Sequence, residues 1–503
     1  MTTEVAPPSA ARALAILGSS SLITVLAGIA SAKLAAELIG PSGFGLVALV
    51  QGISATVAAL IELGLASAVV RAYAPETDVR PSLAALGSCA RRIVLIAGGF
   101  AVVAAAILAP LLSKSILGDD RRPIEFLVAA VAGVPVALAV LENGLMIAAH
   151  RVKAVAKAAV YIAFVSPAVN AAWFITLGQD GVAPGALCSA VVVLAVTSSV
   201  RRRELHEEFG QLESSDVEHP RAGLTRPLLR DGVPVMASAL AGAAAMLLLP
   251  IIVSDRLGRD GVGYYRAANV ISLGYTAAVI TVIGSDFLPR VSRVSSSPVE
   301  VSRLVLKQIR LLTSVLVPLL VVTSALLPLA VTILYRSDFA PTVSILEWQL
   351  VGDLFRVVGS VLATAVFARF GGTRRLITEI LGLGALVALS TLGLYIDGPR
   401  GLGLGFLLTY AMYAAMLWVA LGVSRAGREA TRAAVWLVVA AAACALPPLA
   451  VHITDHERAR WIGFAVAAVW LAPLAKRLKQ RRTVPAPIDP IPGDESALRS
   501  ESG

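Results

Sequence analysis

The feature that most constrains this chain is a series of apolar runs, each about 20 residues long, separated by short polar segments. A helix of that length matches the ~30 Å hydrocarbon core of a bilayer. Only helices and closed barrels satisfy their backbone polar groups in lipid, and the alternating ten-residue segments typical of barrels are absent. The composition agrees, because 57% of the residues are hydrophobic and only 15% are charged. The sequence therefore predicts an all-α polytopic membrane protein.

Fourteen transmembrane helices are predicted from these runs. The spans are 14–37, 44–70, 93–113, 124–148, 154–177, 183–200, 233–254, 264–288, 309–334, 343–366, 376–396, 401–422, 433–452 and 460–475. The 43 Lys and Arg residues concentrate in the loops on one side, so the positive-inside rule places both termini in the cytoplasm. We expect a bacterial inner-membrane protein. The net charge of +10 reflects this topology and does not indicate nucleic-acid binding.

The order of the spans predicts two six-helix lobes and three smaller segments. The predicted parts are an N-terminal lobe at 1–200, a cytoplasmic linker at 201–232, a C-terminal lobe at 233–422, two additional helices at 423–475 and a cytoplasmic disordered tail at 476–503.

An internal repeat relates the two lobes. Residues 39–45 (IGPSGFG) align with residues 257–263 (LGRDGVG), and Ser54 aligns with Ser272 at the same offset. Both copies follow the first span of their half, which predicts pseudo-symmetric lobes around a central cavity that opens alternately to each side. Glycines in tight turns permit positive φ angles. The predicted turn glycines are Gly40, Gly43, Gly45, Gly258, Gly261 and Gly263.

The same segments resemble a known family. The stretches 33–45 (KLAAELIGPSGFG), 62–71 (ELGLASAVVR), 263–269 (GYYRAAN) and 287–292 (FLPRVS) are similar to those of polysaccharide flippases in the multidrug/oligosaccharidyl-lipid/polysaccharide exporter superfamily. The resemblance implies a transporter, not an enzyme. It implies movement of an undecaprenyl-pyrophosphate-linked oligosaccharide to the outer leaflet by alternating access, in some members with an ion gradient. Membrane lipid, a glycan polymerase and chain-length proteins are the implied partners.

Ionisable residues inside spans are costly in lipid, so they usually face a bundle interior or water. The basic ones are Lys33, Arg266 and Arg356, which suit a pyrophosphate group, and Asn269 suits sugar hydroxyls. Structural roles stay open for all four. Lys33 and Arg266 could extend to the membrane surface, Asp353 could neutralise Arg356, and Asn269 could bond another helix.

Carboxylates in spans are candidates for binding a coupling proton or sodium ion. We expect Glu62, Asp286 and Asp353 to be the best placed, while Glu142, Glu347 and Glu379 complete the set. The alternative is ion pairing of Glu62 and Asp286 with nearby arginines. No cofactor and no metal site are expected.

Other functions remain open at this point. A lipid II flippase or a drug/cation antiporter would use the same architecture. A membrane glycan polymerase or ligase would need a large outer loop, and the predicted outer loops are short. A non-transporting scaffold for glycan assembly would need no basic residue in mid-membrane. The chain has no GxxxxGK[ST] motif, so it is not expected to hydrolyse nucleotides itself.

Overall fold

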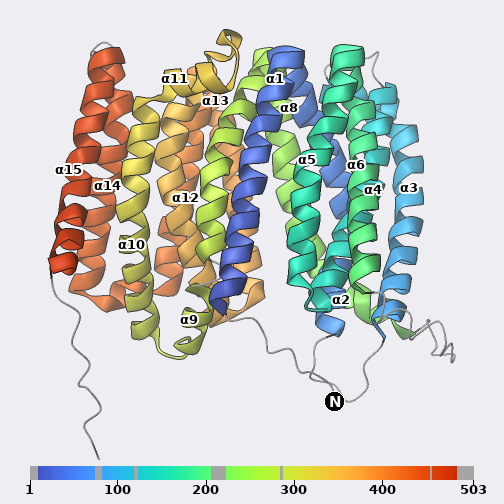
Figure 1. Cartoon of the computed structure of the whole chain (residues 1–503), viewed down its shortest axis with the longest axis horizontal. Helices are drawn as coiled ribbons and strands as arrows, with labels where there is room; N and C mark the ends of the chain where they lie inside the picture. The colour runs from blue at the N-terminus through green and yellow to red at the C-terminus, as the bar shows by residue number, and fades with distance from the viewer. Residues whose placement is uncertain are drawn as a thin grey trace, which may run out of the picture.

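The computed structural model describes residues 10–73, 82–117, 123–205, 223–283, 287–453 and 456–483. Within these ranges every regular element is helical (Figure 1). The helices are α1 (Ala10–Glu62), α2 (Leu65–Ala72), α3 (Leu83–Leu117), α4 (Pro123–Ala148), α5 (Val152–Leu177), α6 (Val182–Glu204), α8 (Thr225–Val282), α9 (Leu288–Arg293), α10 (Pro298–Ala325), α11 (Leu327–Leu334), α12 (Thr342–Phe370), α13 (Gly372–Leu421), α14 (Arg428–Ile453) and α15 (His456–Thr483).

Nine helical stretches in the described part of the chain are long and apolar enough to cross a membrane. Four of them contain 50 or more residues, and a straight helix of that length would measure about 75 Å, more than twice the hydrocarbon core. Each one doubles back at a glycine with positive φ, at Gly40, Gly178, Gly258 or Gly398. The polytopic all-α prediction is therefore confirmed, and the count of fourteen spans stays a prediction.

The four glycine turns define one end of the bundle, which we call the turn end. The opposite end carries α2 and α9 and is called the loop end (Figure 1). Residues 206–222 of the predicted linker lie outside the described residues. The helix α15 runs past the predicted start of the tail to Thr483, and the rest of that tail also lies outside the described part.

The predicted repeat is visible in the backbone. Gly40 breaks α1 with φ 64° and ψ −174°, and Gly258 breaks α8 with φ 70° and ψ −175°. Among the predicted turn glycines, these two have the left-handed φ that glycine tolerates. The two long helices are thus matched hairpins, each with a first arm that ends at the turn and a second arm that returns from it.

Two other repeat glycines allow the hairpins to approach each other. A Cβ atom at Gly45 would overlap the carbonyl oxygen of Arg259, and a Cβ at Gly263 would overlap the carbonyl oxygen of Pro41. These contacts are reciprocal, because Gly45 aligns with Gly263 and Pro41 aligns with Arg259. Gly45 and Gly263 therefore act through close backbone packing and not through an unusual φ. We call this reciprocal contact the α1–α8 seam.

Aromatic side chains pack around the seam at the turn end. The ring of Phe44 lies 6.1 Å from Tyr335 and 6.0 Å from Phe339, while Tyr264 lies 6.2 Å from Phe339. Such separations are typical of favourable aromatic pairs. The Tyr335 hydroxyl donates a hydrogen bond to the carbonyl oxygen of Ala267 at 3.3 Å. The cluster joins α1 and α8 to α11 and the segment that follows it.

The first half is held together by a buried ion-pair network near its loop end. Glu142 of α4 has a side chain only 4% exposed. It accepts hydrogen bonds from Arg91 of α3, at 3.0 Å from Nε and 3.2 Å from Nη2, and pairs with Arg201 of α6. Because a buried charge is costly without partners, this network fixes the three helices relative to one another.

The additional helices α14 and α15 pack against α10. Trp436 of α14 donates from Nε1 to the Thr313 hydroxyl at 2.9 Å, and its ring lies 4.6 Å from that of Trp470 on α15. A buried indole N–H needs such a partner, because an unpaired donor in an apolar environment is unfavourable. The hydrogen bond fixes α14 on the second half of the bundle.

We expect Gly263→Ala to lower the stability of the protein by about 1–3 kcal/mol, because its Cβ would force the α1–α8 seam apart. The thermal unfolding midpoint of the purified protein in detergent measures this. Gly99→Ala in α3 is the matched control, because no atom lies within 4 Å of its added Cβ. Equal midpoints for the two variants would contradict the role assigned to the seam.

Candidate functional site

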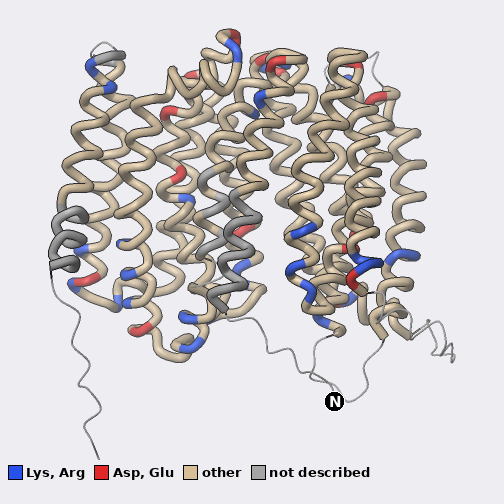
Figure 2. The backbone as a smooth tube through the Cα atoms, viewed as in Figure 1, with Lys and Arg blue, Asp and Glu red and all other residues tan. Residues whose placement is uncertain are grey.

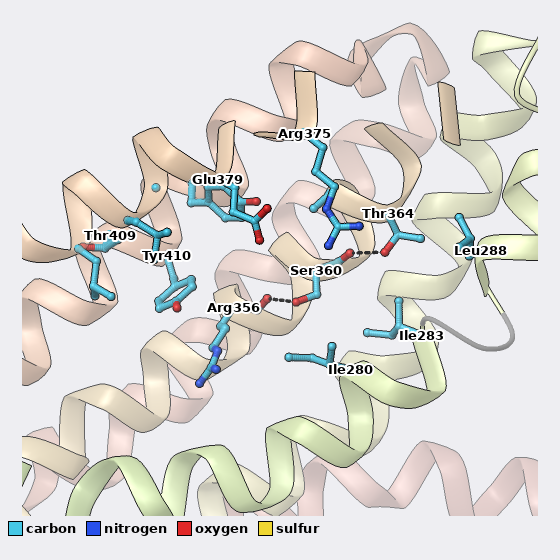
Figure 3. Close-up of a pocket in the computed structure, with 15 residues that line it drawn as sticks. Ile280, Ile283, Leu288, Arg356, Ser360, Thr364, Arg375, Glu379, Thr409 and Tyr410 are labelled. Carbon is cyan, nitrogen blue, oxygen red and sulfur yellow. Dashed lines mark hydrogen bonds between the residues drawn. The ribbon is translucent and has the colours of Figure 1, made fainter. Parts of the chain in front are cut away.

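A polar cavity of about 300 Å³ lies in the second half of the chain (Figure 3). Its walls come from α8, α9, α12 and α13, all in the second half of the chain. The central cavity between the two halves stays a prediction. Its lining residues are Ile280, Ile283, Leu288, Arg356, Ser360, Ala363, Thr364, Arg375, Glu379, Gly382, Leu383, Leu386, Thr409, Tyr410 and Tyr413. At the turn end, α1 and α8 pack against each other at the seam.

One face of α12 supplies a polar wall. Arg356, Ser360 and Thr364 follow one another at helical i, i+4 spacing, which places them on a single face. The Ser360 hydroxyl donates to the carbonyl oxygen of Arg356 at 2.9 Å, and the Thr364 hydroxyl donates to that of Ser360 at 2.8 Å (Figure 3). The hydroxyls are therefore satisfied within their own helix but still present polar oxygens to the cavity.

Arg356 occupies the midpoint of α12. With 14 residues on each side, it lies about 21 Å along the helix from either end. If α12 spans the membrane symmetrically, this position is near the middle of the bilayer. Its side chain is only 17% exposed, and Nη1 lies 3.7 Å from Oδ1 of Asp353. That distance exceeds a hydrogen bond, so the pair is loose. A guanidinium has five N–H donors, and a loose pair leaves donors for an anion in the cavity.

The opposite wall comes from α13, where Arg375 and Glu379 occupy neighbouring turns and point into the cavity (Figure 3). Ser238, on the first arm of α8, donates to Oε2 of Glu379 at 3.4 Å. The Arg356 guanidinium lies 5.7 Å from the ring of Tyr410, and Tyr413 lines the cavity nearby. The cavity thus combines two arginines with a carboxylate, hydroxyls and phenols. Arginines bind phosphate oxygens, while the other groups can hydrogen-bond sugar hydroxyls.

The two other predicted cations do not line this cavity. Lys33 of α1 donates from Nζ to the carbonyl oxygen of Ile333 in α11 at 3.0 Å and lies 3.8 Å from Glu37. Arg266 of α8 donates from Nη2 to Oε1 of Gln51 in α1 at 2.9 Å. Each reaches from one half of the chain to the other, so the structure places both at the contact between the halves.

Asn269 and Asp353, which the sequence predicted to bind sugar and a coupling ion, do not line the cavity either. Asn269 accepts a hydrogen bond from Nε2 of Gln349 at 2.9 Å, which is the interhelical role left open by the sequence. Asp353 is fully buried and accepts a hydrogen bond from the Ser272 hydroxyl at 2.9 Å. It contacts the cavity through Arg356.

The remaining ion-coupling candidates differ in what the structure says of them. The Glu62 carboxylate accepts hydrogen bonds from the backbone N–H groups of Gly64 and Ala66 at the start of α2. A carboxylate at a helix N-terminus is stabilised there, so Glu62 has a capping role. Asp286 lies outside the described residues.

Sequence reasoning did not single out Arg375, Tyr410 and Tyr413, and it named Glu379 among the coupling-ion candidates without ranking it with the best placed. Arg375 looks like part of a basic loop because it stands in the first turn of α13. The signal that was available is the i, i+4 series of Arg356, Ser360 and Thr364, which places three polar side chains on one face of a predicted span. No sequence pattern shows that α13 folds back to face it.

The fold and the cavity together define a multi-pass membrane protein with a polar chamber among its helices. The family model described as "Polysaccharide biosynthesis protein" matches residues 34–344, more than half of the chain. The chain therefore belongs to this family, within the multidrug/oligosaccharidyl-lipid/polysaccharide exporter superfamily.

Individual proteins agree with that assignment. The chain is 22% identical over 414 residues to a lipid III flippase of Escherichia coli (strain K12), covering 80% of this chain and 96% of that protein. Its fold is similar to that of the lipid II flippase MurJ in an inward closed conformation, with a TM-score of 0.67, 14% identity and coverage of 92% and 100%. An inward-facing MATE family transporter gives a TM-score of 0.58 at 18% identity, covering 81% and 95%.

If the cavity binds undecaprenyl diphosphate, the lipid carrier that the sequence resemblance implies, we expect Arg356→Ala to leave the protein folded and to weaken that binding at least tenfold. The reason is that a hydrogen bond to a charged group contributes about 1.5–3 kcal/mol. Binding to the purified protein in nanodiscs measures this. Arg356→Lys should give an intermediate affinity, since ammonium is a point charge and cannot form the paired bonds of guanidinium. Arg303→Ala, an exposed position on α10, is the control. Unchanged binding in a folded Arg356→Ala protein would remove Arg356 from the site.

Proposed function

We propose that this protein moves an undecaprenyl-diphosphate-linked oligosaccharide from the cytoplasmic to the outer leaflet of a bacterial inner membrane, for cell-surface polysaccharide synthesis. The observation that carries the proposal is Arg356, a cation at the midpoint of a membrane-spanning helix that lines a polar cavity. Membership of the polysaccharide biosynthesis family supports it, as does the similarity to a lipid III flippase.

The chemistry of the cavity suits the part of this substrate that cannot cross lipid alone. A diphosphate is costly in hydrocarbon, and an arginine at mid-membrane offsets that cost through charge-assisted hydrogen bonds. A volume of about 300 Å³ is at the lower end of the range for drug-sized ligands. The cavity therefore suits the diphosphate and the sugar next to it, and the apolar polyprenyl chain would stay in the lipid.

The orientation in this proposal follows from the charges. Lys and Arg residues are concentrated at the loop end (Figure 2), which by the positive-inside rule faces the cytoplasm. Both termini then lie in the cytoplasm and the turn end faces outward. The cavity extends from Arg356 at mid-membrane towards Arg375 in the first turn of α13, which starts at the loop end. The substrate would enter it from the cytoplasmic side.

The alternatives fit this cavity less well. A drug/cation antiporter needs a site that attracts cations, whereas two arginines and one carboxylate line this cavity. A lipid II flippase also moves a diphosphate-linked lipid, so it is the second candidate, favoured by the structural similarity to MurJ. Ion coupling belongs to the proposal as well, and Glu379 is the carboxylate that lines the cavity.

We expect deletion of this protein to trap undecaprenyl-linked oligosaccharide in the cytoplasmic leaflet and to abolish the surface glycan. Leaflet-resolved labelling of the lipid-linked glycan in the deletion strain measures both. Complementation with the wild-type chain should restore the glycan, and complementation with Arg356→Ala should not. Normal delivery of full-length intermediates to the outer leaflet in the deletion strain would refute the proposal. Accumulation of lipid II in place of the oligosaccharide would favour the second candidate.

A further inference from the structure

Two hydrogen bonds between side chains join α12 to the second arm of α8. Gln349 donates from Nε2 to Oδ1 of Asn269, and the Ser272 hydroxyl donates to Oδ1 of Asp353, both at 2.9 Å. The partners are spaced i, i+4 on α12 and i, i+3 on α8, so each set lies on one face of its helix. The two helices are therefore joined by these two side-chain hydrogen bonds, which we call the polar ladder.

Asp353 connects these hydrogen bonds to the cavity, because it lies beside the cavity-lining Arg356. Its Oδ1 accepts from Ser272 at 2.9 Å and lies 3.7 Å from Nη1 of Arg356, and its side chain is fully buried. A phosphate oxygen within hydrogen-bond distance of Arg356 would interact with the guanidinium more strongly than Asp353 does at 3.7 Å. An anion in the cavity therefore competes with Asp353 for the same cation.

The far end of the ladder leads to the contact between the two halves. On the same arm of α8, Arg266 donates to Gln51 of α1 at 2.9 Å. One turn earlier, Gly263 packs against the carbonyl oxygen of Pro41 at the α1–α8 seam. Because α8 is one continuous helix between these points, a displacement at Ser272 is carried to the seam.

The internal repeat supplies a comparison. Ser54 is the repeat equivalent of Ser272, and its hydroxyl donates to the carbonyl oxygen of Ala129 in α4 at 2.7 Å and to that of Val50 at 2.9 Å. A backbone carbonyl carries no net charge and cannot be drawn away by a ligand. In the first half, Ser54 is thus bonded to an uncharged backbone group. In the second half, Ser272 is bonded to the Asp353 carboxylate, which lies beside Arg356.

We propose that Asp353 is a positioning residue that transmits anion binding at Arg356 to α8 through Ser272, and so links occupancy of the cavity to the α1–α8 seam. When the anion binds Arg356, the attraction between Arg356 and Asp353 weakens, and Asp353 shifts together with Ser272, to which it is hydrogen-bonded on α8. This inference rests on the proposed function, whose diphosphate-linked substrate is the anion.

The first test separates binding from movement. It uses full-length protein in proteoliposomes with undecaprenyl diphosphate carrying one fluorescent sugar. Asp353→Asn keeps an acceptor for Ser272 but removes the charge that faces Arg356, and Ser272→Ala breaks the link to α8. We expect each variant to bind the lipid within threefold of wild type and to flip it at least tenfold more slowly. The double variant should be no slower than the singles, because all three break one connection.

Two controls identify a merely structural effect. Ser54→Ala removes the equivalent serine from the first half and should flip the lipid at the wild-type rate. Ser272→Thr retains the hydroxyl and should flip the lipid at close to the wild-type rate, unlike Ser272→Ala. The inference is overturned if Asp353→Asn and Ser272→Ala flip normally. It is also overturned if they lose binding and flipping in parallel, as expected for Arg356→Ala, since Asp353 would then only support the binding arginine.

A second measurement follows the seam directly. The variant Ser42→Cys/Asp260→Cys places one thiol in each of the two turns, in a chain whose native cysteines are replaced by alanine. The rate at which these two thiols form a disulfide reports the contact at the seam. Undecaprenyl diphosphate should change that rate at least threefold, uncharged undecaprenol should not, and Asp353→Asn should abolish the response. A response that persists in Asp353→Asn contradicts the inference. If wild-type protein neither binds nor flips the lipid, the proposed function fails instead.

Discussion

The close approach of α1 and α8 is the contact on which the rest of this structure depends. Both helices are hairpins bent at glycines with nearly the same backbone angles, Gly40 and Gly258. Gly45 and Gly263 then let each hairpin touch the backbone of the other. Any larger side chain at these positions would separate the two halves. Within the described part of the chain, glycine turns at Gly178 and Gly398 connect two further pairs of neighbouring spans.

Charges inside the membrane are handled in three different ways. Glu142 is surrounded by two arginines and fixes α3, α4 and α6. Arg266 donates from Nη2 to a neutral amide across the seam and lies 4.9 Å from the ring of Phe44, while its buried Nε has no hydrogen-bond partner among the described residues. Arg356 has only a loose partner and faces a cavity. Satisfied charges in lipid are structural, whereas a loosely paired charge beside a cavity can exchange its partner for a ligand. What separates Arg356 from Arg266 is its place on the wall of the described cavity.

The two halves of the fold are related by an internal repeat, so positions at which they differ indicate where a function was added to one half. The repeat matches turns, glycines and the serine pair, yet the two halves differ in what the equivalent serines contact. In the first half the bond ends on a backbone carbonyl, and in the second it ends on Asp353. The described cavity likewise lies in the second half. The proposed site therefore lies where the second half departs from the symmetric pattern.

The sequence by itself determined that this is an all-α polytopic protein with an internal repeat, because hydrocarbon thickness sets helix length and glycine marks the turns. It also identified Arg356 as a cation within a span, since the sequence shows directly which charges lie inside an apolar run. Only the tertiary structure decided the site. Lys33 and Arg266 are also single basic residues in predicted spans, although they lie nearer the outer ends of those spans than Arg356 does. Helix packing places both at contacts with the other half of the chain. Arg375, Glu379 and Tyr410 join Arg356 because α13 folds back against α12, a long-range contact that helical periodicity does not encode.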